Sequence, residues 1–204
     1  MIRGNIIVIS APSGAGKTTI CRALLPRMES LVLSVSYTTR ERRVGEEGGK
    51  DYYYVDEKEF DNMVNRNEFL EYAKVFGNWY GTSCSVVETI VSGGGDALLE
   101  IDTQGGNSVK AAVPETILIG IVPPDRDTLR KRLIGRARDS REDIERRLDE
   151  AWKEINGLRK YDYIVVNNEL ETAIRQVECI VRAQRSRWER TKGVLDTILH
   201  EKGD

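Results

Sequence analysis

The sequence predicts an α/β protein whose parallel sheet of about five strands is covered by helices on both faces. Short all-apolar segments alternate along the chain with segments of helical periodicity. Strands that are apolar on both faces suit the centre of a covered parallel sheet. A glycine-rich segment joins the first strand-like run to the first helical one, which is a third sign of this class. The 204 residues suffice to bury a core of this kind.

Five apolar runs are the predicted strands of the sheet: residues 6–9, 31–35, 97–101, 117–122 and 163–166. Helical stripes of apolar side chains are predicted between and after them: residues 18–28, 108–113, 125–134, 144–158 and 170–188. The last of these stripes runs from Leu170 to Trp188 and predicts one long helix. The regular alternation of the two element types indicates an open α/β sheet.

Two segments do not fit this alternation. Residues 36–91 hold strand-like runs around a helix start of capping-box type at Asp56, so we expect a small α+β insertion. Residues 125–150 are dense in charge and are divided near Gly135, so we expect a helical hairpin there. The core domain would then comprise the remaining residues: 1–35, 92–124 and 151–204.

The composition excludes several functional classes. The 31 basic and 33 acidic residues give a net charge of −2, which predicts no general attraction to nucleic acid. No apolar run approaches the ~20 residues of a membrane span, and we expect no signal peptide before the first strand. Three cysteines without a Cys-x-x-Cys pair indicate a cytoplasmic location. The single histidine, His200, argues against histidine-based catalysis, and the oligomeric state stays undetermined.

The segment from Ser10 to Thr19 has the context and composition of a phosphate-binding loop, and we call it the phosphate loop. Glycines let backbone N–H groups turn around an anion, and the following helix adds its N-terminal dipole. Lys17 would add a point charge, and the hydroxyl of Thr18 would reach Mg²⁺. The ATP contacts predicted here are Ala11, Pro12, Ser13, Gly14, Ala15, Gly16, Lys17, Thr18 and Thr19. The fold predicted is therefore the three-layer P-loop NTPase fold, against the alternative of a glycine-rich turn with an exposed lysine.

Further motifs follow the phosphate loop in order. Three arginines, Arg40, Arg42 and Arg43, lie within four residues after a strand and suit the binding of a phosphate. Later motifs are Gly48-Gly49-Lys50-Asp51-Tyr52, Glu68-Phe69-Leu70-Glu71-Tyr72, Gly77-Asn78-Trp79-Tyr80-Gly81-Thr82, Glu100-Ile101-Asp102-Thr103-Gln104-Gly105 and Arg132-Leu133-x-x-Arg136. In this order, from about residue 6 to residue 174, the sequence resembles the guanylate kinases of bacterial type, which are P-loop nucleoside monophosphate kinases.

This resemblance implies an enzyme that uses ATP and Mg²⁺ to phosphorylate GMP, and dGMP as well, to the diphosphate in purine nucleotide metabolism. It implies that 36–91 is the GMP-binding insertion and that 125–150 is a mobile helical lid. GMP would be held by Ser36, Arg40, Arg43, Tyr52, Glu71, Tyr80, Thr82 and Asp102. Arg132, Arg136 and Arg147 would close on the transferring phosphates, and Asn167 would lie near the adenine. Thr18 would hold Mg²⁺, with Asp102 acting through a water.

The chemistry agrees with these roles. Guanine presents N1–H and N2–H₂ donors on one edge, and the carboxylate of Glu71 can accept both, whereas adenine lacks this pair of donors. A site of this kind discriminates by up to ~10⁴–10⁵-fold. The acceptor phosphate, with a second pKa of ~6, is already mostly dianionic and needs no general base. Lys17, the arginines and Mg²⁺ would then align two phosphates and neutralise their charge for direct in-line transfer.

Each residue also has a structural interpretation. Tyr52 and Tyr80 would pack the insertion, Glu71 would be an outward side chain, and Arg132 with Arg136 would form surface ion pairs. The basic C-terminal helix is best interpreted as a solvated face.

Two other functions remain open for the chain as a whole. One is a catalytically inactive guanylate-kinase-like interaction module, against which the intact Gly14, Gly16 and Lys17 argue. The other is a P-loop kinase for another small phosphorylated acceptor, which would leave the carboxylates of Glu71 and Asp102 unpaired.

Overall fold

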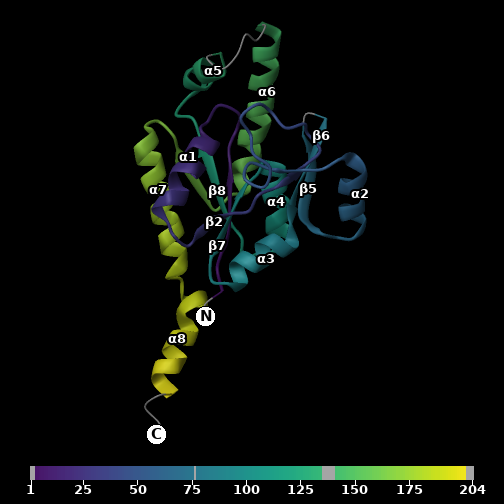
Figure 1. Ribbon diagram of the computed structural model, residues 1–204. Helices are drawn as coiled ribbons and strands as arrows, with labels where there is room; N and C mark the ends of the chain where they lie inside the picture. The colour runs from purple at the N-terminus through teal and green to yellow at the C-terminus, as the bar shows by residue number, and fades with distance from the viewer. Residues whose placement is uncertain (1–2, 76, 135–140, 201–204) are drawn as a thin grey trace.

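The computed structural model describes residues 3–75, 77–134 and 141–200 (Figure 1). Within them lies a main sheet of parallel strands in the order β2-β7-β1-β8-β9. These strands are β1 (Ile6–Ser10), β2 (Leu31–Leu33), β7 (Asp96–Glu100), β8 (Ile117–Val122) and β9 (Tyr163–Val166). The five predicted strands and the parallel sheet are therefore confirmed.

Helices cover both faces of the main sheet, so this part of the molecule has three layers (Figure 1). Helices α1 (Lys17–Leu24) and α7 (Leu170–Arg185) share one buried cluster with Ile7 and Ile9 of β1. Helices α3 (Cys84–Ser92) and α4 (Thr103–Ala112) share another with Val8. Neighbouring residues of β1 thus serve opposite clusters, because successive side chains of a strand point to opposite faces.

A second, mixed sheet lies beside the main one in the order β4-β3-β6-β5 (Figure 1). Its strands are β3 (Tyr37–Thr38), β4 (Tyr53–Tyr54), β5 (Phe69–Val75) and β6 (Asn78–Ser83). Helix α2 (Glu57–Asn65) begins where the capping box predicts it, because the Asp56 side chain accepts a hydrogen bond of 2.7 Å from the Glu59 N–H. Phe60 of this helix is fully buried and stacks on Phe69 of β5.

The charged segment forms two helices, α5 (Arg126–Ile134) and α6 (Arg141–Gly157), which lie at the top of Figure 1. Leu129 and Leu133 of α5 pack on Leu148 and Ala151 of α6, in a cluster separate from those of the main sheet. The two helices are therefore held to each other by their own small core. Helix α6 runs on into a 3₁₀ turn, Leu158–Lys160.

Two helices differ from the prediction. Helix α4 begins after Asp102, not at residue 108, because Gly105 and Gly106 in its first turns carry no helical signal. The predicted long last helix is wrong: α7 ends at Arg185 and a separate α8 (Trp188–His200) follows. Trp188 is 61% exposed and does not continue the buried stripe.

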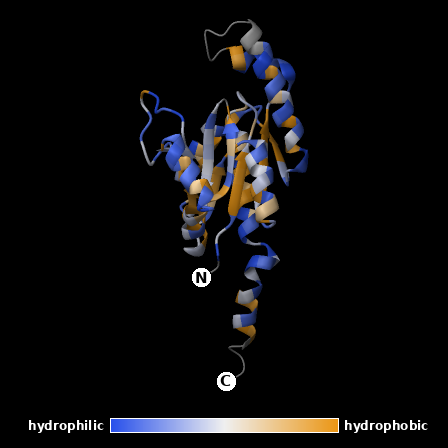
Figure 2. Cartoon of the chain, turned by 90° about the vertical axis from the view of Figure 1, so that its right-hand side faces the viewer, coloured by the Kyte–Doolittle hydropathy of each residue, from blue (hydrophilic) through white to orange (hydrophobic). Residues whose placement is uncertain are grey.

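Helix α8 extends away from the body of the molecule, and its apolar residues alternate with polar ones (Figures 1 and 2). Arg190 ties its first turns to the start of the chain by donating hydrogen bonds to the carbonyl oxygens of Arg3 and Gly4 and to Asn5 Oδ1. These bonds hold the start of α8 against the residues that precede β1. None of the helices described in the structure is long and apolar enough to cross a membrane.

The carboxylate of Asp96, at the start of β7, is 1% exposed and joins three segments of the chain. It accepts hydrogen bonds from the backbone N–H of Asn5 at 2.7 Å, from Asn5 Nδ2 at 2.9 Å and from Arg185 Nε at 2.6 Å. It thereby links β7 to the residue before β1 and to the end of α7.

We predict that Asp96→Ala lowers the free energy of unfolding by about 2–4 kcal/mol, because it leaves buried donors and an arginine without their acceptor. Urea denaturation of both proteins measures the difference. The control is Glu88→Ala, which removes an exposed ion pair of 2.6 Å with Arg3 and should cost less than about 1 kcal/mol. Equal losses in the two variants would contradict the role assigned to Asp96.

Candidate active site

The phosphate loop takes the shape that an anion cradle requires. Gly14 and Gly16 have φ values of +86° and +96°, in the left-handed region that favours glycine. The Ala15 N–H donates to the Pro12 carbonyl at 3.0 Å, and α1 begins directly after Gly16. The loop thus leads into the positive end of a helix, as expected for the binding of a phosphate.

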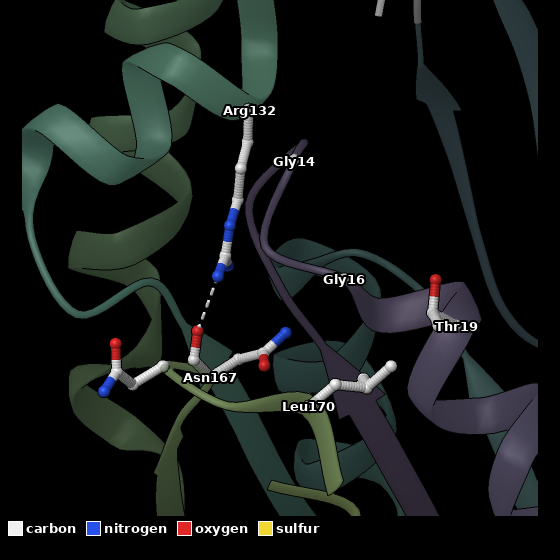
Figure 3. A pocket seen from close by; sticks show the side chains of 7 residues that line it. Gly14, Gly16, Thr19, Arg132, Asn167 and Leu170 are labelled. Atoms are coloured by element: carbon white, nitrogen blue, oxygen red, sulfur yellow. Dashed lines mark hydrogen bonds between the residues drawn. The ribbon is translucent and has the colours of Figure 1, made fainter. Parts of the chain in front are cut away.

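Asn167, which follows β9, supports this loop from the side (Figure 3). Its buried Nδ2 donates to the Ala15 carbonyl at 2.7 Å, and a methyl group on Gly16 would lie only 2.5 Å from that nitrogen. Its own carbonyl accepts a hydrogen bond of 3.0 Å from Arg132 Nη2. A pocket of about 400 Å³ lies here, lined by Gly14, Gly16, Thr19, Arg132, Asn167, Asn168 and Leu170. Two of the predicted residues, Arg132 and Asn167, are therefore brought to the phosphate loop.

The end of β7 meets the phosphate loop on the other side. Lys17 Nζ donates to the Ile101 carbonyl at 3.1 Å, and the Thr18 hydroxyl donates to the carboxylate of Glu100. Asp102, predicted to act on Mg²⁺ through a water, caps α4, and its Oδ1 accepts from the Gly105 N–H at 2.7 Å. The hydroxyl of Thr18 and the carboxylate of Glu100 are hard oxygen ligands, so they fit Mg²⁺.

Glu100 was not among the residues predicted for the site. The available signal was its position, because it ends a strand that pairs with the one leading into the phosphate loop, with Glu100 opposite Ile9. Within the part of the chain that the structure describes, no group of three or more acidic, histidine or cysteine side chains is arranged to hold a metal ion.

The carboxylate of Glu71 lies inside the molecule, on β5 of the second sheet, and is 8% exposed. Its Oε1 accepts a hydrogen bond of 2.6 Å from the hydroxyl of Thr82, on the paired strand β6. A methyl group on Gly105 would lie 2.8 Å from Glu71 Oε2 and 3.4 Å from Asp102 Oδ1. The two carboxylates predicted to bind the base therefore converge at the first turn of α4, with Thr82 beside them.

Burial raises the pKa of Glu71 to about 7, because the charged form loses its hydration. The hydrogen bond from Thr82 acts in the opposite direction, and the negative charge of Asp102 raises the pKa further. A ligand that brings two N–H donors to the oxygens of Glu71 would therefore stabilise the ionised form of this carboxyl group.

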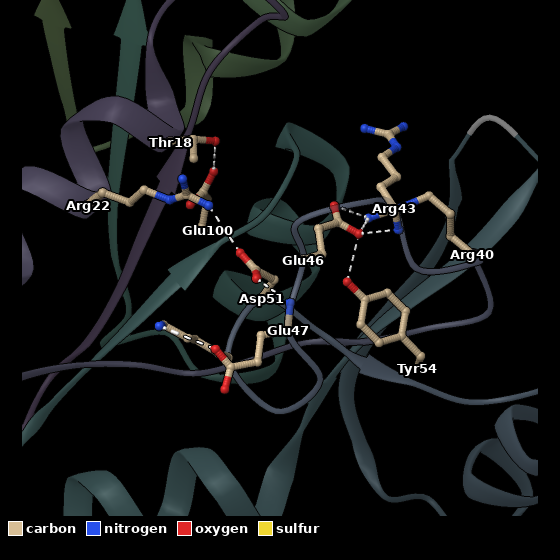
Figure 4. A network of polar contacts seen from close by, with 10 residues as sticks. Thr18, Arg22, Arg40, Arg43, Glu46, Glu47, Asp51, Tyr54 and Glu100 are labelled. Carbon is tan, nitrogen blue, oxygen red and sulfur yellow. Dashed lines mark hydrogen bonds and ion pairs between the residues drawn. The ribbon is translucent and has the colours of Figure 1, made fainter.

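The residues predicted to hold the acceptor phosphate gather where the loop after β3 turns back on the second sheet. The guanidinium of Arg40 lies 5.3 Å from the centre of the Tyr52 ring, and the rings of Tyr52 and Tyr80 pack edge to face with their centres 5.8 Å apart. Burial raises the pKa of Tyr52 to about 12, so the phenol stays a hydrogen-bond donor. Ser36 lines a cavity together with Arg40, Tyr52 and Tyr80. Arg43 also lines it, but its side chain is exposed and extends away from the cluster (Figure 4).

Two further acidic residues touch these groups and were missed by the sequence analysis. Glu46 pairs with Arg40 at 2.8 Å. Glu154 of α6 accepts a hydrogen bond of 3.2 Å from the Ser13 N–H in the phosphate loop. Arg147 lies seven residues before Glu154 and therefore on the same face of α6. The predicted residue Arg136 lies outside the described residues.

One cavity of about 760 Å³ joins the two halves of the site. Thr18 and Glu100 line it beside the phosphate loop, and Arg40, Tyr52 and Tyr80 line it on the second sheet. The cavity thus reaches from Thr18, directly after the phosphate loop glycines, to the residues predicted to hold the acceptor phosphate.

Comparison with known proteins gives one consistent family. Residues 3–184 match the guanylate kinase family. The chain is similar to the guanylate kinase of Shewanella sp., with 45% identity over 90% of this chain and 89% of the relative. It is similar to that of Alkalilimnicola ehrlichii, with 43% identity over 97% and 98%. The crystal structure of guanylate kinase from Anaplasma phagocytophilum is similar too, with a TM-score of 0.78, 35% identity and coverage of 93% and 90%.

We predict that Gly105→Ala raises the KM for GMP by about 10–100-fold and leaves the KM for ATP unchanged. The added methyl group would displace the carboxylate of Glu71, and the loss of a charged hydrogen bond costs about 1.5–3 kcal/mol. Steady-state kinetics in both substrates measures this. Gly193→Ala is the matched control, since a methyl group there meets nothing within 4 Å. An unchanged KM for GMP in Gly105→Ala would remove Glu71 from the base site.

We predict that GMP binding releases protons near neutral pH. With a pKa of about 7, roughly half of the Glu71 side chains are protonated at pH 7, and guanine binding favours the ionised form. Titration calorimetry in buffers of different ionisation enthalpy should then give about half a proton released per GMP at pH 7. The release should fall as the pH rises above the pKa of Glu71. The substrate phosphate contributes only about 0.1 proton at pH 7, so a release no larger than this would contradict the prediction.

Proposed function

This chain belongs to the guanylate kinase family and is an enzyme that phosphorylates GMP with ATP, and we propose that the residues described above carry out the transfer. The observation that carries this assignment is the continuous cavity of about 760 Å³. Thr18 and Glu100, beside the phosphate loop, line it on one side, and Arg40, Tyr52 and Tyr80, which suit a phosphate monoester, line it on the other.

On the donor side, the backbone N–H groups of the phosphate loop and Lys17 Nζ bind the phosphates of ATP. The pocket beside Asn167 takes the adenine, and Arg132 faces the phosphates from above Gly14. Thr18 and Glu100 would hold Mg²⁺, whose positive charge offsets the negative charge of the phosphate oxygens. Asp102 is then assigned to binding the guanine base.

On the acceptor side, Glu71 and Asp102 accept the N1–H and N2–H₂ donors of guanine, while Thr82 and Ser36 bind its O6. Arg40, Tyr52 and Tyr80 hold the phosphate, and Arg43 joins them when its exposed side chain swings inward. These contacts address only the base and the phosphate, so dGMP is expected to be accepted as well.

The transfer itself needs no proton acceptor. An oxygen of the dianionic GMP phosphate attacks the γ-phosphorus of ATP, a new P–O bond forms, and the bond to the β–γ bridging oxygen breaks as ADP leaves. The residues of this chain align the two phosphates and stabilise the charge on them. Arg132, Arg136 and Arg147 are proposed to surround the phosphoryl group.

We propose that the insertion 36–91 and the lid 125–150 move toward the core when the two nucleotides bind. The separate core of α5 and α6 supports this, because the pair can shift as one body without disturbing the clusters of the main sheet. Lid arginines that arrive only with substrate would also keep water from the γ-phosphate. The three unpaired cysteines support the cytoplasm as the location of the enzyme.

A coupled assay of ADP release tests the function. We expect turnover with GMP and Mg²⁺ and very little with AMP, CMP or UMP. Lys17→Ala and Arg40→Ala should each lower kcat/KM by at least about 100-fold, because each removes a cation from a phosphate. Lys58→Ala, on the exposed face of α2, is the control. Absence of turnover with every acceptor would favour the interaction module, and equal rates with AMP would favour another acceptor.

A further inference from the structure

The loop that carries Arg40 closes on itself through Glu46. The Glu46 N–H donates to the Arg43 carbonyl at 3.2 Å, and the intervening Gly45 has a φ of +88°, as a tight turn with a left-handed third residue requires. The Arg43 N–H in turn donates to Glu46 Oε2 at 2.9 Å. This turn directs the Glu46 carboxylate back toward the start of the loop.

The carboxylate of Glu46 is surrounded by donors (Figure 4). Arg40 Nη2 lies 2.8 Å from Oε1 and 3.0 Å from Oε2, and the hydroxyl of Tyr54 donates to Oε2 at 2.8 Å. The side chains of Arg40 and Glu46 are only 12% and 21% exposed. These contacts lower the pKa of Glu46 to about 2, the bond from Arg40 being the largest cause, so the group stays ionised at physiological pH.

The guanidinium of Arg40 is held from several directions. Its Nη1 donates to the Glu41 carbonyl at 2.8 Å, and its plane lies near the rings of Tyr52 and Tyr54, at 5.3 and 5.9 Å. A guanidinium has five N–H donors. Nη2 is directed at Glu46 and one Nη1 donor at Glu41, and Tyr80 interacts with the same guanidinium, so its orientation is fixed where Arg40 lines the cavity.

From these contacts we propose that Glu46 is a positioning residue for the acceptor phosphate. Its carboxylate holds the guanidinium of Arg40 in the orientation that receives GMP before GMP arrives, so that substrate binding does not have to order a flexible arginine. The proposal rests on the function proposed above. It adds a residue that acts only through Arg40 and does not touch the substrate.

The test compares Glu46→Gln with Glu47→Gln, a neighbouring substitution of the same kind. Glu47 is 70% exposed, and its side chain pairs only loosely with Lys50, at 3.4 Å. In Glu46→Gln, one acceptor oxygen becomes an NH₂ group that faces the N–H donors of Arg40. We expect the Kd for GMP, measured by titration calorimetry, to rise at least about tenfold in Glu46→Gln and less than about twofold in Glu47→Gln.

Guanosine and ATP separate a positioning role from a general loss of structure. In Glu46→Gln, the inhibition constant of guanosine, which has no phosphate, and the KM for ATP should stay within about twofold of the wild-type values. In an Arg40→Ala background, Glu46→Gln should add no further loss of GMP affinity, because its effect passes through the arginine. Tyr54→Phe removes one partner of Glu46 and should raise the Kd for GMP in the same direction by a smaller factor.

Two results would overturn the proposal. An unchanged Kd for GMP in both Glu46→Gln and Tyr54→Phe would show that Arg40 does not need the carboxylate. A lower Kd in Glu46→Gln would show that the carboxylate competes with the phosphate for Arg40. Neither result affects turnover of GMP by the wild-type chain, which alone decides the proposed function.

Discussion

The parallel pairing of β1 with β7 fixes where the reacting groups of this enzyme stand. Ile9 lies opposite Glu100, so the chain leaves both strands at the same edge of the main sheet. Ser10 Oγ bonds the Asp102 carbonyl at 3.0 Å there, and Lys17 reaches the Ile101 carbonyl. The phosphate loop and the start of α4 are thereby held together. Glu71 of the second sheet lies against this first turn of α4, close to Gly105 and Asp102.

A common feature of the site is that carboxylates occupy donors expected to meet phosphates or to stand beside them. Glu46 lies on Arg40, Glu100 accepts from Thr18, and Glu154 accepts from the Ser13 N–H. Among these donors the side chain of Arg40 is only 12% exposed, and an unpaired donor at that depth is costly, so Glu46 stabilises it. The negative charge of these carboxylates also offsets part of the repulsion between the cationic groups of the site.

The sequence was sufficient to predict the strands of the main sheet, because each is a short apolar run. The central strands are buried on both faces, whereas the edge strands β2 and β9 keep exposed side chains such as Val32 and Ile164. It also predicted that Glu71, Thr82 and Asp102 belong to one site, but this rested on the order of motifs, since no periodicity relates β5 to α4. Glu46 and Glu154 were missed because an acidic residue among many others carries no local signal, whereas for Glu100 the position at the end of its strand was an available signal. Their roles depend on partners that the fold brings together, in the case of Glu154 from 141 positions away. The break before Trp188 was missed because neither proline nor glycine marks it.

The bonds from Arg190 to the carbonyl oxygens of Arg3 and Gly4 bear on how this chain can be rearranged by design. They bring the residues before the first strand and the beginning of α8 into contact, so a short linker can join these two points in a circularly permuted polypeptide. The molecule is in this sense nearly closed into a ring, with α8 as an appendage beyond the point of closure.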